Sequence, residues 1–253
     1  MIDLHSHLLP GVDDGSRSVE QSVGVLAELA SQGVTDICLT PHLRAGQVAA
    51  GPPEAHDRAF EALVARAPTA PRLHRGAEVM LDRPLAVDPG RIRRTTLGGS
   101  RYLLVEFPRM VAFETVGIAL GRILETGLVP LLAHPERYRC CSEEAVARWR
   151  GLGALMQVDG PTLVTSRARG QRARDLVAAG LADIIAGDNH GDDRSIAQGY
   201  QFLLAQDAAD QGELLARHNP AAILADGRPE PVPPVQIRST WMQRLRQVLE
   251  GDL

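Results

Sequence analysis

Lysine is absent from this chain of 253 residues, so each of its 27 basic residues is an arginine. Without a lysine amine, the protein cannot form a Schiff base, hold pyridoxal phosphate covalently or use the lysine of a P-loop. Arginine instead offers a planar, permanently charged guanidinium that pairs with phosphate or carboxylate. Lysine-dependent catalysis is therefore excluded, whereas an anionic ligand is easily accommodated.

An excess of basic charge is also missing. The 27 basic side chains face 31 acidic ones, which gives a formal net charge of −4. Nucleic acids and anionic membranes are bound through basic patches, so neither is an expected partner. No apolar run approaches the roughly 20 residues that cross a bilayer, and we expect a protein that is not embedded in a membrane.

Cysteine is scarce and shows no pattern. Cys38, Cys140 and Cys141 have neither disulfide-like nor metal-knuckle spacing. Arg44 follows Cys38 at the Cys-x5-Arg spacing, but the residues between them include Pro41 and His42 and no glycine, so no phosphate cradle is expected there. The first residues lack a basic segment followed by an apolar one. These absences predict a reduced, cytoplasmic protein in which the cysteines are not nucleophiles.

What the chain does contain is an alternation of strand and helix patterns. Short apolar runs predict strands at 2–4, 36–40, 72–80, 102–107, 128–133, 154–158 and 182–186. Between them, helical periodicity is found at 19–32, 54–67, 115–126, 143–150 and 169–179. Mostly apolar strands alternating with helices indicate an α/β protein with a parallel sheet, either a barrel or a doubly wound sheet. Strand-end polar residues favour the barrel.

The C-terminal part has a different composition. Five prolines between residues 219 and 235 predict an extended linker that wraps the domain. After it, Ser239 can cap a short amphipathic helix whose apolar stripe includes Trp241. We expect this stripe to pack on the domain or on a second subunit, which leaves a homo-oligomer open. The predicted division is therefore a domain of residues 1–224 and an extension of residues 225–253.

Histidines and carboxylates gather where the predicted strands end. The positions are His5, His7, His42, Glu78, Glu106, His134, Asp188 and His190. From His7 to His134 they follow one another at intervals of 28 to 36 residues, and the next interval is 54. Because one strand-helix unit takes about 30 residues, these side chains are expected to meet at one end of the sheet.

Two pairs in this set have the spacing of chelating residues. His5 and His7 are two apart on a strand and share a face, as do Asp188 and His190. Imidazole with carboxylate suits Zn, Mn or Fe(II), and carboxylates such as Glu78 favour a multinuclear site. Asp3 lies on the His5 face and is expected at most to support a ligand. His56, His74 and His218 are not expected to bind metal.

Six segments now carry a resemblance: IDLHSH with the following DDG, TPHLRAG, GAEV, YLLVEFP, LLAHPERY and GDNH. In this order they resemble the PHP (polymerase and histidinol phosphatase) superfamily. The chain is most similar to its branch of bacterial manganese-dependent tyrosine phosphatases of capsule and exopolysaccharide synthesis. The resemblance extends from residue 1 to about residue 224, and it implies a distorted (β/α)7 barrel with three metal ions.

The resemblance also implies roles for individual residues. One metal would be held by His5, His7, Glu78 and Asp188, a second by Glu78, Glu106 and His134, and a third by Asp14, His42 and His190. Arg137 matches the arginine that binds phosphate, and Arg44 matches a basic position after His42. Arg194 is the counterpart of a further arginine, although the loop before it is one residue short. The metal would be Mn, with Fe, Zn, Co or Mg as substitutes.

The expected activity is hydrolysis of phosphotyrosine in a protein, by a hydroxide that bridges two metals and without a cysteine nucleophile. The substrate implied by the resemblance is the tyrosine-rich tail of a bacterial kinase that controls polysaccharide export. A phosphoesterase for histidinol phosphate or a nucleotide would use the same metals and stays an alternative. A third alternative is a non-catalytic binding module, whose signature would be the loss of ligands.

Overall fold

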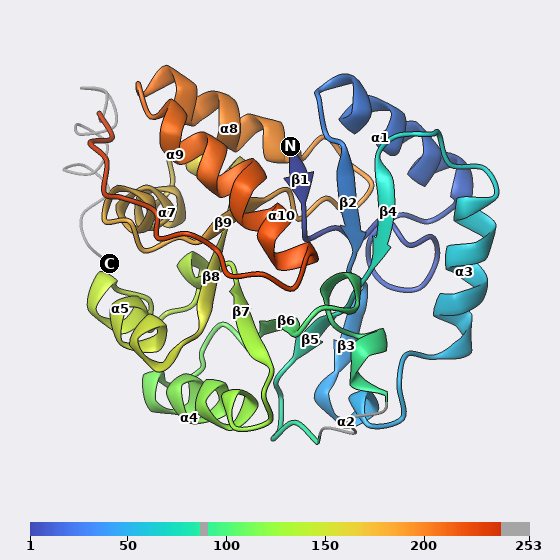
Figure 1. Ribbon diagram of the computed structural model, residues 1–253, viewed down its shortest axis with the longest axis horizontal. Coiled ribbons are helices and arrows are strands. Elements are labelled where there is room, and N and C mark those ends of the chain that lie inside the picture. The colour runs from blue at the N-terminus through green and yellow to red at the C-terminus, as the bar shows by residue number, and fades with distance from the viewer. Residues whose placement is uncertain (87–90, 239–253) are drawn as a thin grey trace.

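Parallel strands form the centre of the computed structural model, which describes residues 1–86 and 91–238 (Figure 1). The strands are β1 (Ile2–Asp3), β2 (Asp36–Leu39), β3 (His42–Arg44), β4 (Arg72–Arg75), β5 (Glu78–Met80), β6 (Tyr102–Glu106), β7 (Val129–Ala133), β8 (Leu155–Asp159) and β9 (Ile184–Ala186). They pair in the orders β1-β2-β4 and β3-β5-β6-β7-β8-β9, and every pair is parallel. The predicted α/β fold with parallel strands is confirmed.

Two breaks in the strands are not predicted by the sequence: a further strand, β3, follows the one expected at 36–40, and the strand expected at 72–80 is split into β4 and β5. Pro41 stands between β2 and β3, where it cannot donate a backbone hydrogen bond to the ladder. Gly76 and Ala77 likewise separate β4 from β5. The amide of Glu78 still donates to the carbonyl of Pro41 at 3.1 Å, so the two sheets continue into each other.

The first and last strands meet at a weak seam. Ser6 and Asn189 form an isolated parallel bridge, and the amide of His7 donates to the carbonyl of Asn189 at 2.7 Å. The amide of Asp188 donates to the carbonyl of His5 at 3.0 Å. Over the described residues the strands thus form two sheets rather than one closed barrel, and the barrel part of the prediction is not established.

Helices cover the strands, and the segments predicted to be helical are largely helical. They are α1 (Val19–Ser31), α2 (Ala45–Val48), α3 (Glu54–Val64), α4 (Phe113–Leu124), α5 (Glu143–Leu152), α6 (Gly160–Leu163), α7 (Ala168–Ala178), α8 (Ile196–Ala205), α9 (Ala209–Glu213) and α10 (Asn219–Leu224). Short 3-10 turns η1 (Ile92–Arg94), η2 (Leu97–Gly99) and η3 (Pro135–Arg137), and the π-helical η4 (Leu214–His218), complete the connections. In Figure 1, α1 and α3 lie beside β2 and β4, while α4 and α5 lie beside β7 and β8.

Ordinary capping and packing hold these helices in place. The Ser18 hydroxyl accepts from the amide of Gln21 at the start of α1, and Ser142 accepts from the amide of Ala145 at the start of α5. Each amphipathic helix buries one face, as α4 does with Leu120. Burial of such a side chain stabilises the fold by about 1.5–3 kcal/mol. These contacts therefore fix the helices against the strands.

The segment after η4 differs in part from the prediction of an extended linker. Asn219–Leu224 is the helix α10, which continues directly from η4 and has Pro220 near its start. Residues 225–238 do run without helix or strand, with Val232 buried and the amide of Val235 bonded to the carbonyl of Ala178 at 2.9 Å. The predicted helix after Ser239 lies outside the described residues, and the division at residue 224 stays a prediction. In the part of the chain described, helices of membrane-crossing length and hydropathy are absent.

Candidate metal centre and active site

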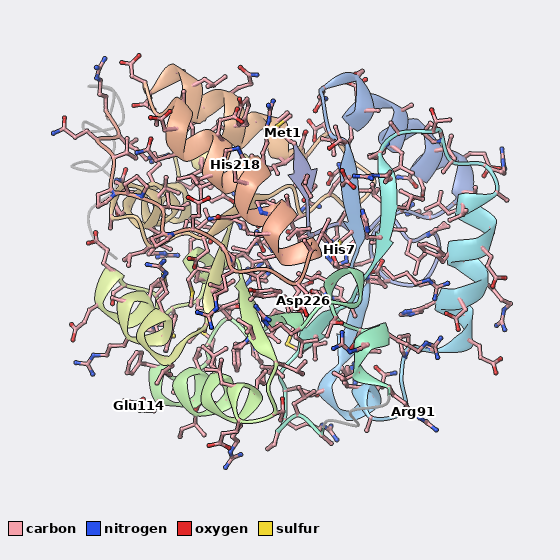
Figure 2. The ribbon with its side chains drawn as sticks, viewed as in Figure 1. Met1, His7, Arg91, Glu114, His218 and Asp226 are labelled. Atoms are coloured by element: carbon pink, nitrogen blue, oxygen red, sulfur yellow. The ribbon has the colours of Figure 1, made fainter. Side chains whose placement is uncertain are left out.

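The nine side chains that the sequence analysis names as ligands come together. Glu106 ends β6 and His134 follows β7, whereas His42 and Glu78 follow β2 and β4 and begin β3 and β5, and Asp14 lies in a loop. The overlapping groups are His5, His7 and Asp188; His5, Glu78 and His134; His42, Glu78 and Glu106; and His7, Asp14, His42 and His190. Within each group, one donor atom per residue lies within 4.8 Å of the others. Figure 2 shows His7 near the middle of the molecule, among the strands. Parallel strands explain this convergence, because all their carboxyl ends face one way.

Four donor atoms form the tightest part of the cluster. The Nε2 atoms of His5 and His7 are 3.2 Å apart. Each lies 3.3 Å from Glu78 Oε2 and 3.3 Å from Asp188 Oδ1. Donors around a tetrahedral ion are about 1.6 bond lengths apart, which is about 3.3–3.4 Å for zinc bonds of about 2.0–2.1 Å. The arrangement therefore fits a metal ion without movement of the backbone.

The remaining ligand candidates extend this group on two sides. His134 Nε2 is 2.9 Å from Glu78 Oε1, and His42 Nδ1 is 3.1 Å from both Glu78 Oε2 and Glu106 Oε1. Asp14 Oδ1 lies 3.4 Å from His42 Nε2 and 3.6 Å from the Nε2 of His190. Because the groups share members, they suit adjacent ions rather than one. These groups overlap with the three ligand sets that the resemblance implies. They differ in that His7 is grouped with Asp14, His42 and His190.

The electrostatics of the cluster favour positive charge. Burial opposes a charged His5, but the carboxylates of Glu78 and Asp188 outweigh it and raise the pKa of His5 to about 9. Burial likewise opposes ionisation of Glu78, yet the surrounding histidines hold its pKa well below the usual range. Glu106 Oε1 is buried, and its 3.1 Å contact with His42 Nδ1 lacks the geometry of a hydrogen bond. Such a site, with buried carboxylates next to imidazoles, suits cations.

Two residues that the sequence analysis missed orient the histidines. His7 Nδ1 is hydrogen-bonded to Asp13 Oδ2 at 2.8 Å, and His5 Nδ1 to Gln157 Oε1 at 2.9 Å. With Nδ1 as the donor in each ring, both Nε2 lone pairs face the cluster. The adjacent carboxylates of the DDG segment could have signalled Asp13. Nothing distinguishes Gln157 in the sequence except its place on the strand just before Asp159.

Backbone strain occurs at two of the ligand candidates. His134 has φ of 35° and Asp188 has φ of 47°, both in the left-handed region that side chains other than glycine rarely adopt. Such residues persist only where the surrounding structure enforces them, and they gather at functional sites. The carboxylate of Asp3 supports this region, because it accepts from the amides of His5 and Gly187.

Two of the three predicted arginines face the cluster. Arg137 and Arg194 line a cavity of about 380 Å³ together with seven of the nine ligand candidates. Arg137 Nη2 donates to the carboxylates of Asp159 and Asp188, and Arg194 Nη1 is 3.4 Å from Asp188 Oδ2. Arg44 instead lines an adjoining pocket of about 480 Å³, which includes His42. Another arginine, Arg109, lines the first cavity and was not predicted.

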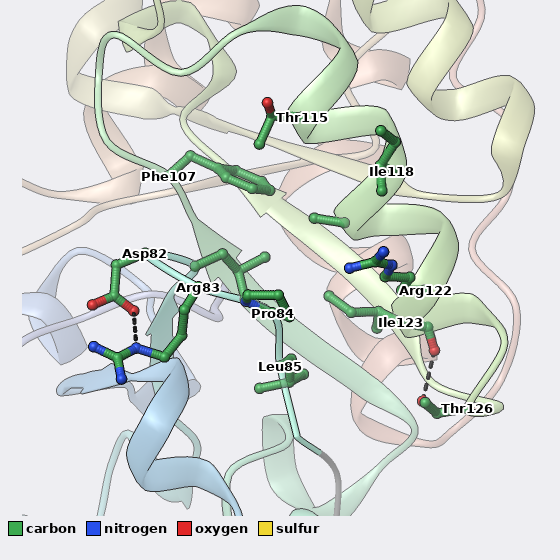
Figure 3. Close-up of a pocket in the computed structure, with 12 residues that line it drawn as sticks. Asp82, Arg83, Pro84, Leu85, Phe107, Thr115, Ile118, Arg122, Ile123 and Thr126 are labelled. Carbon is green, nitrogen blue, oxygen red and sulfur yellow. Dashed lines mark hydrogen bonds and ion pairs between the residues drawn. The ribbon is translucent and has the colours of Figure 1, made fainter.

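A separate apolar cavity of about 290 Å³ lies between the segment after β5 and helix α4 (Figure 3). Its walls include Leu81, Pro84, Ile118 and Ile123. Phe107 lines both this cavity and the one that contains the cluster. The apolar cavity contains none of the nine ligand candidates, so it is not the site of metal-dependent chemistry.

The cysteines are poorly suited to catalysis. Burial raises the pKa of Cys38 above its usual range and raises that of Cys141 to about 12. Among the described residues that line the cluster's cavity there is no cysteine. A thiolate nucleophile would require a lowered pKa and access to substrate, and neither is present.

Comparison with known proteins identifies the family of this chain. The family model of capsular polysaccharide synthesis proteins, CpsB/CapC, matches residues 1–225. The tyrosine-protein phosphatase CpsB of Streptococcus pneumoniae is 28% identical over 240 residues, which cover 89% of this chain and 99% of CpsB. The tyrosine-protein phosphatase YwqE of Bacillus subtilis is 27% identical over 201 residues, which cover 75% of this chain and 77% of YwqE.

Solved structures give the same result for the fold. A crystal structure from work on YwqE and CpsB, described there as metal-dependent tyrosine phosphatases, matches with a TM-score of 0.74 at 22% identity. The match covers 94% of this chain and 100% of the other. The resemblance carried by the sequence motifs is thereby confirmed. The chain belongs to the CpsB/CapC family of capsular polysaccharide synthesis proteins.

Proposed function

We propose that this protein is a metal-dependent protein-tyrosine phosphatase. The observation that carries the proposal is that one cavity contains both the donor cluster and two arginines, Arg137 and Arg194. Hydrolysis of a phosphate ester needs an activated water and neutralisation of charge on the phosphoryl oxygens. A site with both features fits this reaction, and the names of CpsB and YwqE support phosphotyrosine as the substrate.

The metal ions, when bound, activate water for attack at neutral pH and offset charge on the phosphoryl oxygens. We assign them to the nine clustered side chains and infer three ions, with Mn as the native metal and Fe, Zn, Co or Mg as substitutes. Arg137 and Arg194 bind the phosphate oxygens, since a guanidinium can donate two parallel hydrogen bonds to them. Asp159 and Asp188 hold Arg137 in position for this contact. Arg44 lines the adjoining pocket and contacts the substrate beyond the phosphate.

The biological setting follows from the family and is part of the same proposal. The substrate would be a tyrosine-phosphorylated protein, the tail of a bacterial tyrosine kinase that controls capsule or exopolysaccharide synthesis. The protein would act in the cytoplasm. The strand units would form a distorted (β/α)7 ring, closed by the bridge between Ser6 and Asn189.

Hydrolysis by chelator-stripped protein reloaded with Mn tests the proposal. The substrates are a phosphotyrosine peptide, histidinol phosphate and a nucleotide monophosphate, and the control variants are His5→Ala and Glu106→Ala. We expect Mn to restore turnover, fastest on the peptide, while both variants stay folded and inactive. Better turnover of a small metabolite would indicate the metabolite phosphoesterase instead. No turnover of any substrate would favour the binding module.

A further inference from the structure

Two arginines beside the cluster have no acidic partner. Arg109 is exposed and lines the cavity of the cluster, three positions after Glu106. Arg169 is partly buried in the first turn of α7. Neither side chain forms a hydrogen bond or an ion pair with any part of the protein that the structure describes. They differ in this from Arg137 and Arg194, which both contact Asp188.

Several contacts bring the segments that contain these two arginines close to η3, whose Arg137 lines the cavity. Helix α7 packs against η3, and Arg172 Nε donates to the carbonyl of Glu136 at 2.9 Å. The amide of Arg139 donates to the carbonyl of Arg109 at 3.0 Å, which ties the segment after β6 to the segment after η3. Burial lowers the pKa of Arg169, and the charges of Arg137 and Arg109 lower it further, while the nearby carboxylates of Asp159 and Glu136 raise it. The charges of the three arginines are therefore close enough to repel one another.

This arrangement is unfavourable in the protein alone. The first turn of a helix favours acidic residues, because the helix dipole is positive there, yet the first turn of α7 has no acidic residue. An anion placed between Arg109 and Arg169 would relieve the repulsion.

We infer that Arg109 and Arg169 form a second anionic subsite, which binds an acidic or phosphorylated side chain close to the phosphotyrosine of the substrate. The inference rests on the proposed phosphatase activity and adds sequence selectivity to it. The anion belongs to the peptide, since Arg109 lines the cavity that holds the reacting phosphate. A carboxylate and a phosphate share the chemistry that a guanidinium recognises, and the test separates the two sources.

Steady-state kinetics on the Mn-loaded full chain test the inference. The substrates are three phosphotyrosine peptides that differ only in the flanking residues, which are neutral, glutamate or a second phosphotyrosine. We expect the wild-type protein to prefer an anionic flank, through a lower KM. Arg109→Gln and Arg169→Gln should each reduce the ratio of kcat/KM for anionic over neutral peptide by about 3- to 10-fold. A preference for only one anionic peptide would identify carboxylate or phosphate as the source.

Two further variants make the test specific. Arg228→Gln is the matched control, because Arg228 is exposed and follows Gly227, whose carbonyl accepts from Tyr102 at the opposite end of β6. It should keep the wild-type ratio, whereas Arg169→Glu should reverse the preference toward a peptide with basic flanks. Equal losses on neutral and anionic peptides in the glutamine variants would overturn the subsite, as would a wild-type protein that is indifferent to the flank. Failure to hydrolyse any phosphotyrosine peptide would instead overturn the proposed function and the subsite with it.

Discussion

Replacing Asp13 with asparagine should weaken metal binding without removing a proposed metal ligand. Asp13 Oδ2 accepts from His7 Nδ1 at 2.8 Å and from the amide of His42 at 3.0 Å, and Oδ1 accepts from the amide of Gly15 at 3.0 Å. Burial opposes ionisation of Asp13, but the hydrogen bond and charge of His7 outweigh it and lower the pKa to about 2. The side chain is therefore a carboxylate at neutral pH.

The size of the effect follows from these three hydrogen bonds. An asparagine has one acceptor oxygen, so in its best orientation it keeps the bonds to His7 and His42 and turns its amino group toward the amide of Gly15. The bond to His7 also loses its ionic acceptor, which is worth about 1–2 kcal/mol. At about 1.4 kcal/mol for each factor of ten, the affinity for metal falls by about 5- to 30-fold. Similar losses of about 10- to 100-fold are usual when the partner of a metal-binding histidine is replaced.

Calorimetric titration of Mn into stripped protein measures this loss, and phosphotyrosine hydrolysis at increasing Mn measures its consequence. Asp13→Asn should regain most of its activity at high Mn, because the proposed donors are intact. Asp14→Asn should lose more affinity. Asp82→Asn, the same change in a residue paired with Arg83, should lose none. An Mn affinity in Asp13→Asn within twofold of wild type would refute the proposal that Asp13 orients His7 toward a metal.

The other predictions concern the nucleophile, the packing and the core. Cys38→Ser should retain activity, because the buried thiol takes no part in the reaction; an inactive variant that still binds metal would contradict this. Gly199→Ala should lower the melting temperature, since a Cβ there would lie 2.5 Å from the Cα of Gly160. Gly24→Ala, where a Cβ meets nothing within 4 Å, should instead stabilise α1 by about 0.5–1 kcal/mol. Trp149→Ala should cost about 3–5 kcal/mol in a denaturant titration, because Trp149 is 1% exposed in the core; a loss below 1 kcal/mol would refute that packing.

Strand positions and ligand candidates could be predicted because both follow from periodicity. Apolar runs identify the strands, and a polar residue just after such a run lies at a strand end, as Glu106 and His134 do. The HxH and DxH spacings then determine which side chains share a face. No knowledge of the loops is needed for these steps, and the eight candidates found in this way lie together. Asp14, which lies in a loop, was named only through the family resemblance.

The other features of the site depend on where loops and side chains point in space, which a linear pattern of residues does not contain. Asp13 and Asp14 are adjacent in one loop, yet Asp13 is hydrogen-bonded to His7 while Asp14 joins the donor group. Loops have no repeat from which the two could be told apart. Gln157 is a neutral amide whose partner is far away in the sequence, and Arg109 belongs to a loop with no regular structure. The breaks after β2 and β4 arise locally, where a proline or glycine interrupts one strand.

The seam between β1 and β9 has a consequence for how the protein folds. Asp3 and Gly187, which are hydrogen-bonded there, stand 184 residues apart, so nearly the whole chain must be ordered before the seam can close. His5 and His7 lie on one side of the seam and Asp188 on the other. An ion bound by residues from both sides would therefore hold the seam together. Removal of the metal would thus loosen the seam as well as abolish catalysis. Amide exchange at His7 and Asp188, whose amides bond across the seam, should speed up before exchange in the strands elsewhere.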